Sequence, residues 1–322
     1  MNQSILSRFS TMKVAVVGDV MLDLFEYCHS DQSKPIDSEK PGARAYKAQK
    51  LLKQLGGAGN VAANLTALGV HTYLIGVTGN DGHHLTLKQL AEQSGIHYSF
   101  IRDKARPTTT KNRLYLDDEY LLRRDDEANH PIPELISTTV FNEVTFELDG
   151  ADAVILSDYN KGVFSEALAQ DIIRGCRERR IPVIVDFKPP NRSYFRDADI
   201  IAPNATEAEA IWPEFDRSSP IKGGLNELYS MVACRNLIVT LGAHGICGTD
   251  GNNAFHIPAI DVPAMDAVGC GDTTRALLAL GHASGLPLSR SAELANLASS
   301  IVVQKIGTDT VSIEELKVQL PS

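Results

Sequence analysis

Cysteine is scarce in this sequence, and its spacing excludes two common kinds of site. The 322 residues include five cysteines, at positions 28, 176, 234, 247 and 270, and no two of them are spaced as C-x-x-C. An odd number of scattered cysteines argues against a disulfide framework and against a zinc site, and it favours a reducing compartment.

Positive charge and long apolar runs are also lacking. The chain has 31 Lys and Arg against 40 Asp and Glu, for a formal net charge of -9, whereas nucleic-acid binding needs a concentrated basic face. No run approaches the roughly 18 apolar residues of a membrane-spanning helix, and the first twelve residues have no apolar signal segment. We therefore expect a cytoplasmic protein that binds neither nucleic acid nor membranes.

Short apolar runs recur along the chain and alternate with helical patterns. The first, residues 14–17, is β-branched and ends at Gly18, which is typical of a buried parallel strand. Strand followed by helix, repeated in this way, predicts an α/β fold with a doubly wound, mostly parallel sheet flanked by helices. The other expected strands are 73–76, 153–156, 182–185, 200–202 and 237–240, and the expected helices include 58–68, 85–94, 164–179 and 207–212.

Two segments interrupt this alternation. Residues from about 22 to 50 are polar with little helical period, and residues from about 97 to 125 alternate polar and apolar side chains, as in a sheet with one solvated face. We expect these segments to form a small β lid on a single domain that spans residues 1–322.

Polar residues follow several of the expected strands. Asp19 and Asp23 come after the first strand, Asp158 and Asp186 follow two later ones, and Asn204 follows another. One such residue is usually a helix cap or a turn former. Several of them at the carboxyl edge of one sheet favour a ligand site, because ligands of open α/β sheets bind there.

The strongest local pattern is the glycine-rich turn at residues 266–272, before a helical run of alanine and leucine. Its glycines allow backbone N–H groups to point at one place, and the start of the following helix adds partial positive charge. Such a turn can hold a phosphoryl group in flight, and Asp272 can accept the proton of an attacking hydroxyl. An ordinary helix cap with an acidic first turn explains the same residues equally well.

The sequence 266–272 resembles the signature D-x-x-G-A-G-D of the PfkB/ribokinase family of carbohydrate kinases. Cys270 replaces its alanine, and Val268 stands where many members have threonine. The resemblance implies that Asp272 is the catalytic base, that the amides of Gly269, Cys270 and Gly271 form the anion hole, and that ATP with Mg²⁺ is the phosphoryl donor.

Other family features occur in order along the chain, and each implies a role. The sugar would be held by Gly56, Gly57, Asn60 and Asp23. The N-x-x-E motif, which organises Mg²⁺ through water, is matched by Asn204 and Glu207. The nucleotide would lie along Thr240, Gly242 and Gly245, with its adenine near Asn296 and Gly307-Thr308. Asp266 is the candidate ligand for a monovalent cation such as K⁺. The family also leads us to expect a homodimer formed through the lids.

One branch of the family matches from about residue 13 to residue 315: the kinases of D-glycero-β-D-manno-heptose 7-phosphate in ADP-heptose synthesis. The matching stretches are residues 18–23, 110–113, 156–162 and 307–312. They imply phosphorylation of the anomeric hydroxyl to the 1,7-bisphosphate. Residues 35–41 and 186–190 depart from the branch pattern, so another sugar or sugar phosphate stays open as the substrate. The chain is too short for the nucleotidyltransferase domain often fused to such kinases, so we expect that step in a separate protein.

A phosphorylated sugar also requires basic partners in the protein. The candidates are Arg44, Lys111, Arg113, Arg123, Lys161 and Lys188, and the last two are favoured because they follow buried strands. Together with Asp19, Asp158 and Asp186, they complete the predicted sugar site.

Two other functions stay open. Gly57-x-Gly59-x-x-Ala62 fits a dinucleotide-binding fingerprint, but that motif needs a strand before it, whereas residues 47–55 have a helical pattern. The second is a sugar-phosphate binder that kept the fold without catalysis, which the substitutions at Cys270 and Val268 would allow.

Overall fold

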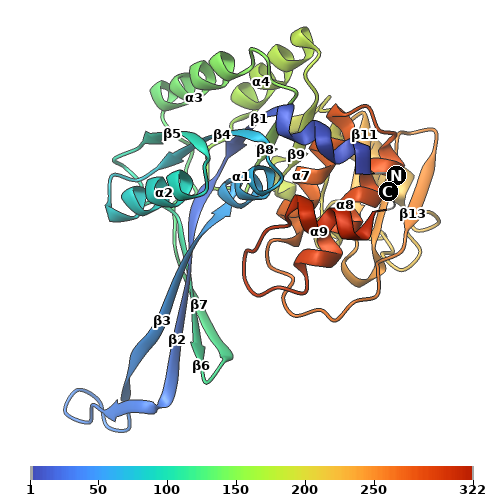
Figure 1. The fold of residues 1–322 in the computed structure, drawn as a ribbon. Helices are drawn as coiled ribbons and strands as arrows, with labels where there is room; N and C mark the ends of the chain where they lie inside the picture. Colours follow the sequence, from blue (N-terminus) through green and yellow to red (C-terminus); the bar gives the residue numbers. More distant parts are fainter. Residues whose placement is uncertain (1–2, 321–322) are drawn as a thin grey trace.

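The computed structural model describes residues 3–320, which form one large sheet and one small sheet (Figure 1). The large sheet has the order β13-β12-β11-β10-β9-β8-β1-β4-β5, and its strands from β11 to β5 in that order run parallel. This confirms the predicted ribokinase-like α/β fold. The strands are β1 (Lys13–Gly18), β4 (His71–Thr78), β5 (His97–Arg102), β8 (Ala153–Ser157), β9 (Val183–Asp186), β10 (Ile200–Ile201), β11 (Asn236–Thr240), β12 (Ile246–Thr249) and β13 (Ala254–Ile257).

Helices cover both faces of the large sheet because its buried strands are apolar on both sides. Val14 and Val16 of β1 pack into the core under one helical layer, and Ala15 and Val17 pack into the core under the other. The first layer contains α1 (Ala58–Ala67), α2 (Gly82–Gln93), α7 (Cys270–Ala283), α8 (Leu288–Val302) and α9 (Ile313–Gln319). The second contains α3 (Glu134–Glu147), α4 (Glu166–Arg179), α5 (Ala205–Ile211) and α6 (Leu225–Val232).

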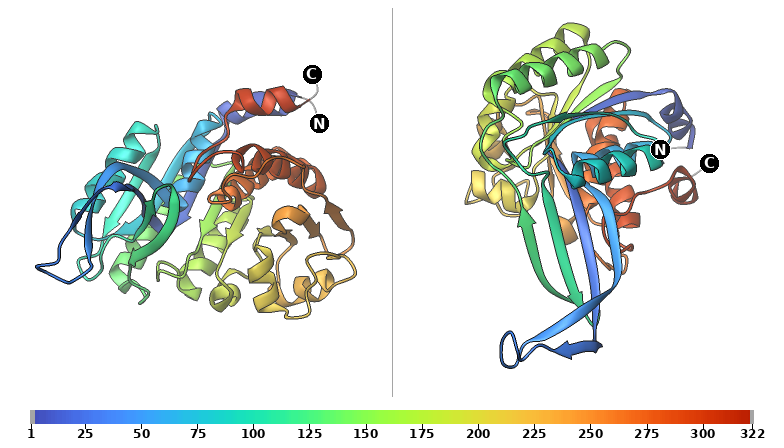
Figure 2. Two further views of the ribbon diagram at one scale, coloured as in Figure 1. Left: turned by 90° about the horizontal axis from the view of Figure 1, so that it is seen from below. Right: turned by 90° about the vertical axis from the view of Figure 1, so that its left-hand side faces the viewer.

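Short 3₁₀ helices complete the fold, at η1 (Gln3–Thr11), η2 (Pro189–Phe195) and η3 (Gly242–His244). The two ends of the described chain lie side by side (Figure 2). The Gln3 side chain donates hydrogen bonds to the carbonyl oxygens of Lys317 and Leu320 in and just after α9. Among the helices of the described part, none is both long and apolar enough to cross a membrane.

The small sheet stands away from the body of the molecule as a lid (Figures 1 and 2). Its order is β3-β2-β6-β7, from β2 (Val20–Pro35), β3 (Arg44–Gly57), β6 (Thr110–Leu116) and β7 (Glu119–Asp126). Only Asp19 separates β1 from β2, so the lid grows directly out of the carboxyl end of a central strand. The β2–β3 pair continues beyond the end of β6–β7.

Two details of the lid differ from the sequence-based expectation. Residues 97–102 were expected in the lid but form β5, which pairs in parallel with β4 at the edge of the large sheet. The helix expected at residues 47–55 is wrong, because these residues lie in β3, paired with β2 from Val20↔Gly57 to Pro35↔Arg44. Lys47, Lys50 and Lys53 recur at every third position, which resembles the period of a helix, but in the structure their side chains are exposed on a strand.

Candidate active site

A cleft of about 730 Å³ lies beyond the carboxyl ends of β10 and β11 and beside the start of α7. Its size suits a nucleotide-sized ligand, and it is lined by most of the residues that the sequence assigned to the nucleotide and to the anion hole, though not by Glu207 or Gly269. Among those that line it are Asn204, Thr240, Gly242, Gly245, Cys270, Gly271 and Asn296. Residues 92 positions apart in the sequence therefore meet at one cavity.

The start of α7 borders the cleft at Cys270 and Gly271, and the Cys270 N–H donates to the carbonyl oxygen of Ala267 at 3.4 Å. Gly269 is the N-cap residue and has a left-handed φ of 84°, which favours glycine. A Cβ at this position would lie 2.9 Å from Nδ2 of Asn60, so glycine also permits close approach of α1. Burial raises the pKa of the Cys270 thiol to about 11, which keeps it neutral at pH 7. The helix start thus faces the cleft without a competing negative charge from Cys270.

Asp272 is buried in the first turn of α7 and is held by two donors. Asn60 Nδ2 donates to its Oδ2 and Tyr159 Oη donates to its Oδ1, each at 2.8 Å. Burial raises the pKa of Asp272, and the nearby Arg275 guanidinium opposes that shift together with the two hydrogen bonds. The carboxylate lies where the nucleotide cleft meets the base of the lid, which suits a general base.

On the lid side, two glycines allow β3 to approach the acidic residues closely. A Cβ on Gly56 would lie 2.3 Å from Asp23 Oδ2, and one on Gly57 would lie 2.5 Å from the carbonyl oxygen of Asp19. Asp23 is buried and pairs with Arg113, with 2.7 Å between Oδ1 and Nη1. Arg113 and Asp23, which were both predicted to bind the sugar, therefore form an ion pair with each other.

Asp19 and Asp158 are buried carboxylates at the ends of neighbouring strands. Oδ2 of Asp19 accepts backbone hydrogen bonds from Tyr159 (2.7 Å) and Lys161 (3.1 Å), and Asp158 accepts from the Asn191 amide (2.8 Å). Burial raises the pKa of Asp158, and burial together with Asp158 raises that of Asp19 to about 7. Within the described residues, Oδ1 of Asp19 is buried without a hydrogen-bond partner, which is the state expected of a group awaiting a ligand hydroxyl.

Two of the candidate cations gather around one aromatic ring. The ammonium groups of Lys111 and Lys188 lie 5.0 and 5.1 Å from the centroid of the Tyr159 ring, within the range of cation–π attraction. Burial lowers the pKa of Lys111. Both ammonium groups thus lie near the residue whose hydroxyl bonds Asp272, and Lys188 also pairs with Glu207.

The remaining candidate cations have partners other than the Tyr159 ring. Lys161 pairs with Glu127 at 2.6 Å, and Arg123 pairs with Asp125 at 2.8 Å on the lid. Arg44, the first residue of β3, donates to Ser33 where β2 and β3 pair at the end opposite to Val20 and Gly57. Arg44 therefore lies apart from the other candidates, whereas Arg123 is opposite Arg113 across β6 and β7, and it adds to the effect of burial in lowering the pKa of Lys111.

Asn204 and Glu207 form a capping box at the start of α5. The Asn204 side chain accepts from the Glu207 N–H, and the Glu207 carboxylate accepts from the Asn204 N–H and also pairs with Lys188. Mg²⁺ in kinases is typically held by one or two carboxylates, waters and substrate phosphates. In the structure both oxygens of the buried Glu207 carboxylate are engaged within the protein, Oε2 by the Asn204 N–H and Oε1 by Lys188.

Asp266 and Thr308, two further predicted residues, form hydrogen bonds that connect segments near the start of α7. Asp266 accepts hydrogen bonds from the N–H groups of Val268 (2.9 Å) and Gly307 (3.0 Å), which ties two loops together. Thr308 donates to the Gln54 side chain on β3 instead of lining the cleft. Asn296 does line the cleft, and its amide donates to the carbonyl of Pro258 at 2.9 Å.

Sequence reasoning missed Tyr159 and Arg275 as residues of the site. Tyr159 lies between Asp158 and Asn160 in a matching stretch, but its contact with Asp272 crosses 113 residues of sequence. Arg275 could have been found from the sequence, because a charged residue just before the apolar run 276–280 of a buried helix indicates a buried charge that needs a partner.

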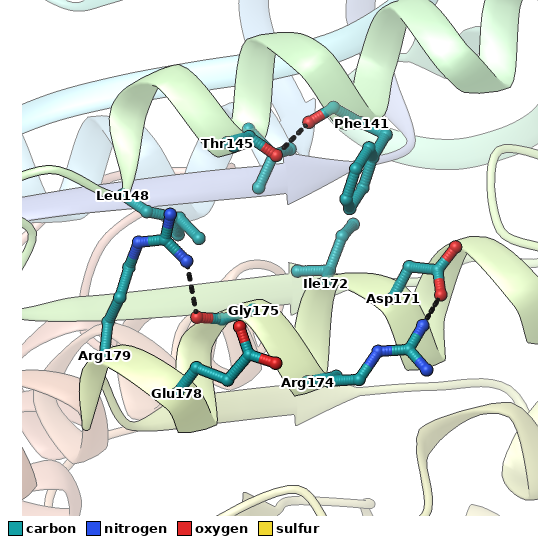
Figure 3. Close-up of a pocket in the computed structure, with 10 residues that line it drawn as sticks. Phe141, Thr145, Leu148, Asp171, Ile172, Arg174, Gly175, Glu178 and Arg179 are labelled. Atoms are coloured by element: carbon teal, nitrogen blue, oxygen red, sulfur yellow. Dashed lines mark hydrogen bonds and ion pairs between the residues drawn. The ribbon is translucent and has the colours of Figure 1, made fainter.

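A second, smaller hollow of about 140 Å³ lies between α3 and α4 (Figure 3). Arg174 pairs there with Asp171, and Arg179 donates to the carbonyl of Gly175 at 3.1 Å. The hollow contains none of the predicted site residues and lies on a helical face of the sheet, so it is not part of this site.

The fold, the cleft beside the start of α7 and the buried Asp272 are those of a sugar kinase of ribokinase-like fold. Residues 11–316 match the pfkB family of carbohydrate kinases. The chain belongs to this family, whose members are ATP-dependent phosphotransferases.

Curated relatives and solved structures agree with this assignment. The chain is 36% identical over 320 residues to the bifunctional protein HldE of Trichlorobacter lovleyi and 37% identical over 314 residues to that of Pseudomonas entomophila. These matches cover 98% and 97% of this chain but 64% of each relative, so the chain spans less than two thirds of their length.

Among solved structures, phosphofructokinase-2 from Escherichia coli in complex with substrates and products superposes with a TM-score of 0.77 at 18% identity. That match covers 96% of this chain and 99% of the other. Ribokinase from Thermotoga maritima has a TM-score of 0.70 at 22% identity and covers 95% of this chain and 98% of its own. At these identities the likeness shows the fold.

Proposed function

We propose that this chain transfers the γ-phosphoryl group of ATP to the anomeric hydroxyl of D-glycero-β-D-manno-heptose 7-phosphate and forms the 1,7-bisphosphate. The observation that carries the proposal is the position of Asp272, buried at the start of α7 between the nucleotide cleft and the acidic lid base. The similarity to two HldE proteins supports the heptose phosphate as acceptor.

In the proposed reaction, Asp272 takes the proton of the sugar hydroxyl as its oxygen attacks the γ-phosphorus in line. A new phosphorus–oxygen bond forms while the bond to ADP breaks. The amides at the start of α7 stabilise the negative charge that develops on the transferred group. The lid excludes water, which would otherwise compete as acceptor.

Mg²⁺ and a monovalent cation belong to the same proposal. Glu207 would hold Mg²⁺ through water, and the bound ion would neutralise charge on the nucleotide phosphates. Asp266 would be near a monovalent cation, although both of its oxygens accept amide hydrogen bonds.

Lys111 and Lys188 are proposed to receive the phosphate of the sugar itself. Both lie around Tyr159, next to the base, and an ammonium group is a strong partner for a phosphate. Asp19 and Asp23 would accept hydrogen bonds from sugar hydroxyls, with Asn60 fixing the base beside them.

We further propose that the chain acts as a cytoplasmic homodimer joined through the lids. Both ATP and sugar phosphates are cytoplasmic metabolites, which supports that compartment. All eight residues of β7 are exposed, including Tyr120, Leu121 and Leu122. Adjacent exposed apolar side chains on a sheet that stands alone favour contact with a second copy.

The decisive experiment is ATP turnover measured with a panel of sugars and sugar phosphates that includes the heptose 7-phosphate. The heptose phosphate should give the highest kcat/KM, and Asp272→Asn should lower kcat by about a hundredfold or more while ATP still binds. Faster turnover of another acceptor would support the proposed kinase activity but would show that the substrate is a different sugar or sugar phosphate. Binding of sugar phosphate with no turnover across the panel would favour a non-catalytic binder.

A further inference from the structure

A buried arginine lies one turn into α7, directly beside the predicted base. The side chain of Arg275 is 6% exposed, and its Nη2 lies 2.7 Å from Oδ1 of Asp186 at the end of β9. Its Nη1 lies 3.9 Å from Oδ1 of Asp272. Nη2 also donates to the carbonyl oxygen of Ala202, after β10, at 3.4 Å. One guanidinium group therefore connects two strand ends with the start of α7.

Placing a charge here is unfavourable unless the charge is matched. Arg275 is followed by a run of buried apolar residues, 276–280, and its Nε has no hydrogen-bond partner within the described residues. A buried ion is tolerated when an opposite charge and hydrogen bonds replace water around it. Asp186 and Asp272 supply that opposite charge, and they raise the pKa of the guanidinium against the effect of burial.

The two carboxylates depend on the arginine in turn. Burial raises the pKa of both Asp186 and Asp272, and the guanidinium opposes the rise in each. Without that cation, two buried carboxylates would share one region of low dielectric, and one of them would take up a proton.

Glycine at position 271 provides the space that the guanidinium occupies. A Cβ on Gly271 would lie 2.3 Å from Nη1 of Arg275, so the charged group rests against the backbone of the anion hole. Arg275 also lines the nucleotide cleft. The arginine is thus built into the reaction centre and not into a distant part of the core.

We propose that Arg275 is a positioning residue for phosphoryl transfer, whose guanidinium bridges Asp186 and Asp272 and holds Asp272 as a charged base at the start of α7. This inference rests on the proposed function. A protonated Asp272 could not accept the proton of the sugar hydroxyl, so the bridge maintains the form of the base that reacts.

Several charged or titratable groups face Asp272, and the test must take all of them into account. Arg275 is the cation that pairs with Asp272, and Lys188, which follows β9, is a second cation that acts on Asp186. The other groups are Asp23 on β2, Tyr159 after β8, Asp186 on β9 and Cys270 on α7, with Glu207 on α5 facing Arg275 and Asp186.

The experiment compares Arg275→Met, Arg275→Lys and the wild type between pH 6 and pH 9, on the acceptor that the wild type uses best. Arg275→Met should lower kcat at pH 7 by about tenfold or more, and the loss should shrink at high pH as Asp272 regains its charge. The KM for ATP should change less than about threefold, and Arg275→Lys should retain more activity than Arg275→Met. Arg290→Met, which removes an exposed arginine of α8, is the matched control.

A double variant tests the bridge itself. Asp186→Asn combined with Arg275→Met leaves Asp272 without a carboxylate neighbour at the end of β9, so kcat at pH 7 should recover above that of Arg275→Met alone. If Arg275→Met does not fold, recovery of folding in the double variant supports the same charge relationship. An Arg275→Met kcat within about twofold of the wild type, or a loss equal at every pH, overturns the proposal.

Urea unfolding gives a measurement that needs no turnover. The stability gap between the wild type and Arg275→Met should widen as pH rises from 6 to 9, because the variant must then bury an unmatched negative charge. If that gap widens while the wild type phosphorylates no acceptor, the bridge stands and the proposed function fails. A gap that is constant with pH contradicts the bridge whatever the activity.

Discussion

The hydroxyl of Tyr159 donates a 2.8 Å hydrogen bond to Oδ1 of Asp272, and Asn60 occupies Oδ2 at the same distance. The ammonium groups of Lys111 and Lys188 both lie within cation–π range of the tyrosine ring. Hydrogen bonds to a carboxylate favour its charged form. An incoming sugar hydroxyl must therefore bond to Asp272 beside these donors or displace one of them.

Replacement of Tyr159 by Phe removes one of the two donors without changing the ring. We expect kcat at pH 7 to fall about tenfold and its rise with pH to move to higher pH, because the pKa of Asp272, already raised by burial, rises further. Steady-state kinetics from pH 5 to pH 9 would show this shift. Tyr194→Phe, outside the site, serves as control. An unchanged pH profile would show that the hydrogen bond does not influence the base.

Replacement of Lys188 by Ala removes an ammonium group that lies near both Tyr159 and Glu207. If Lys188 binds the sugar's phosphate, the KM for the sugar phosphate should rise on the order of tenfold, far more than the KM for ATP. Lys222→Ala, at an exposed position, is the control. Equal increases in both KM values would mean that Lys188 acts through Glu207 instead.

Asp19 should make folding stability depend on pH. Burial raises its pKa from 3.8 to about 7, so the folded state binds the proton more tightly than the unfolded state does. The resulting stability is fully present below pH 4 and is lost as pH rises through 7, by on the order of 4 kcal/mol or less.

Asp19→Asn removes this titration, so the variant should gain stability relative to the wild type between pH 4 and pH 8. Urea unfolding across that range measures the difference. Asp31→Asn, at an exposed carboxylate on the lid, is the matched control. A stability difference for Asp19→Asn that stays constant with pH would contradict the raised pKa.

Charge on the outer strand of the lid should weaken the proposed dimer. Leu122 is 47% exposed on β7, and Leu122→Asp would place a carboxylate in the expected interface, which would be unfavourable to bury. Sedimentation velocity should show a shift from dimer to monomer at micromolar concentration. Leu135→Asp, at an exposed leucine of α3, should leave the mass unchanged. A wild type that is monomeric at all concentrations would remove the lid interface from the proposal.

The large sheet could be predicted because each of its central strands is a continuous apolar run, and such a run by itself indicates a buried strand. Residues 14–17 and 153–156 are fully buried β-branched or aliphatic stretches, and they pair in the structure. The lid was harder because β3 is stabilised by pairing with β2 across a turn, while its exposed side chains carry no alternation. Non-local pairing overrides local pattern there.

In the site, too, residues of one continuous motif could be predicted, whereas contacts between distant parts of the sequence could not. The turn 266–272 and the N-x-x-E stretch are continuous in sequence, so their residues could be proposed directly. The contacts of Asp272 with Tyr159 and of Arg275 with Asp186 join residues about a hundred positions apart. Conversely, Arg44 was proposed by charge alone, and the structure places it at the start of β3, bonded to Ser33 and apart from the other candidate cations.

The three groups that hold Asp272 come from α1, from the loop after β8 and from α7 itself, so the base is assembled from the first fifth, the middle and the last fifth of the chain. During synthesis, Asn60 and Tyr159 emerge well before α7 does. The carboxylate of Asp272, its two hydrogen-bond donors and its cation can therefore come together only after the last long helices have been made.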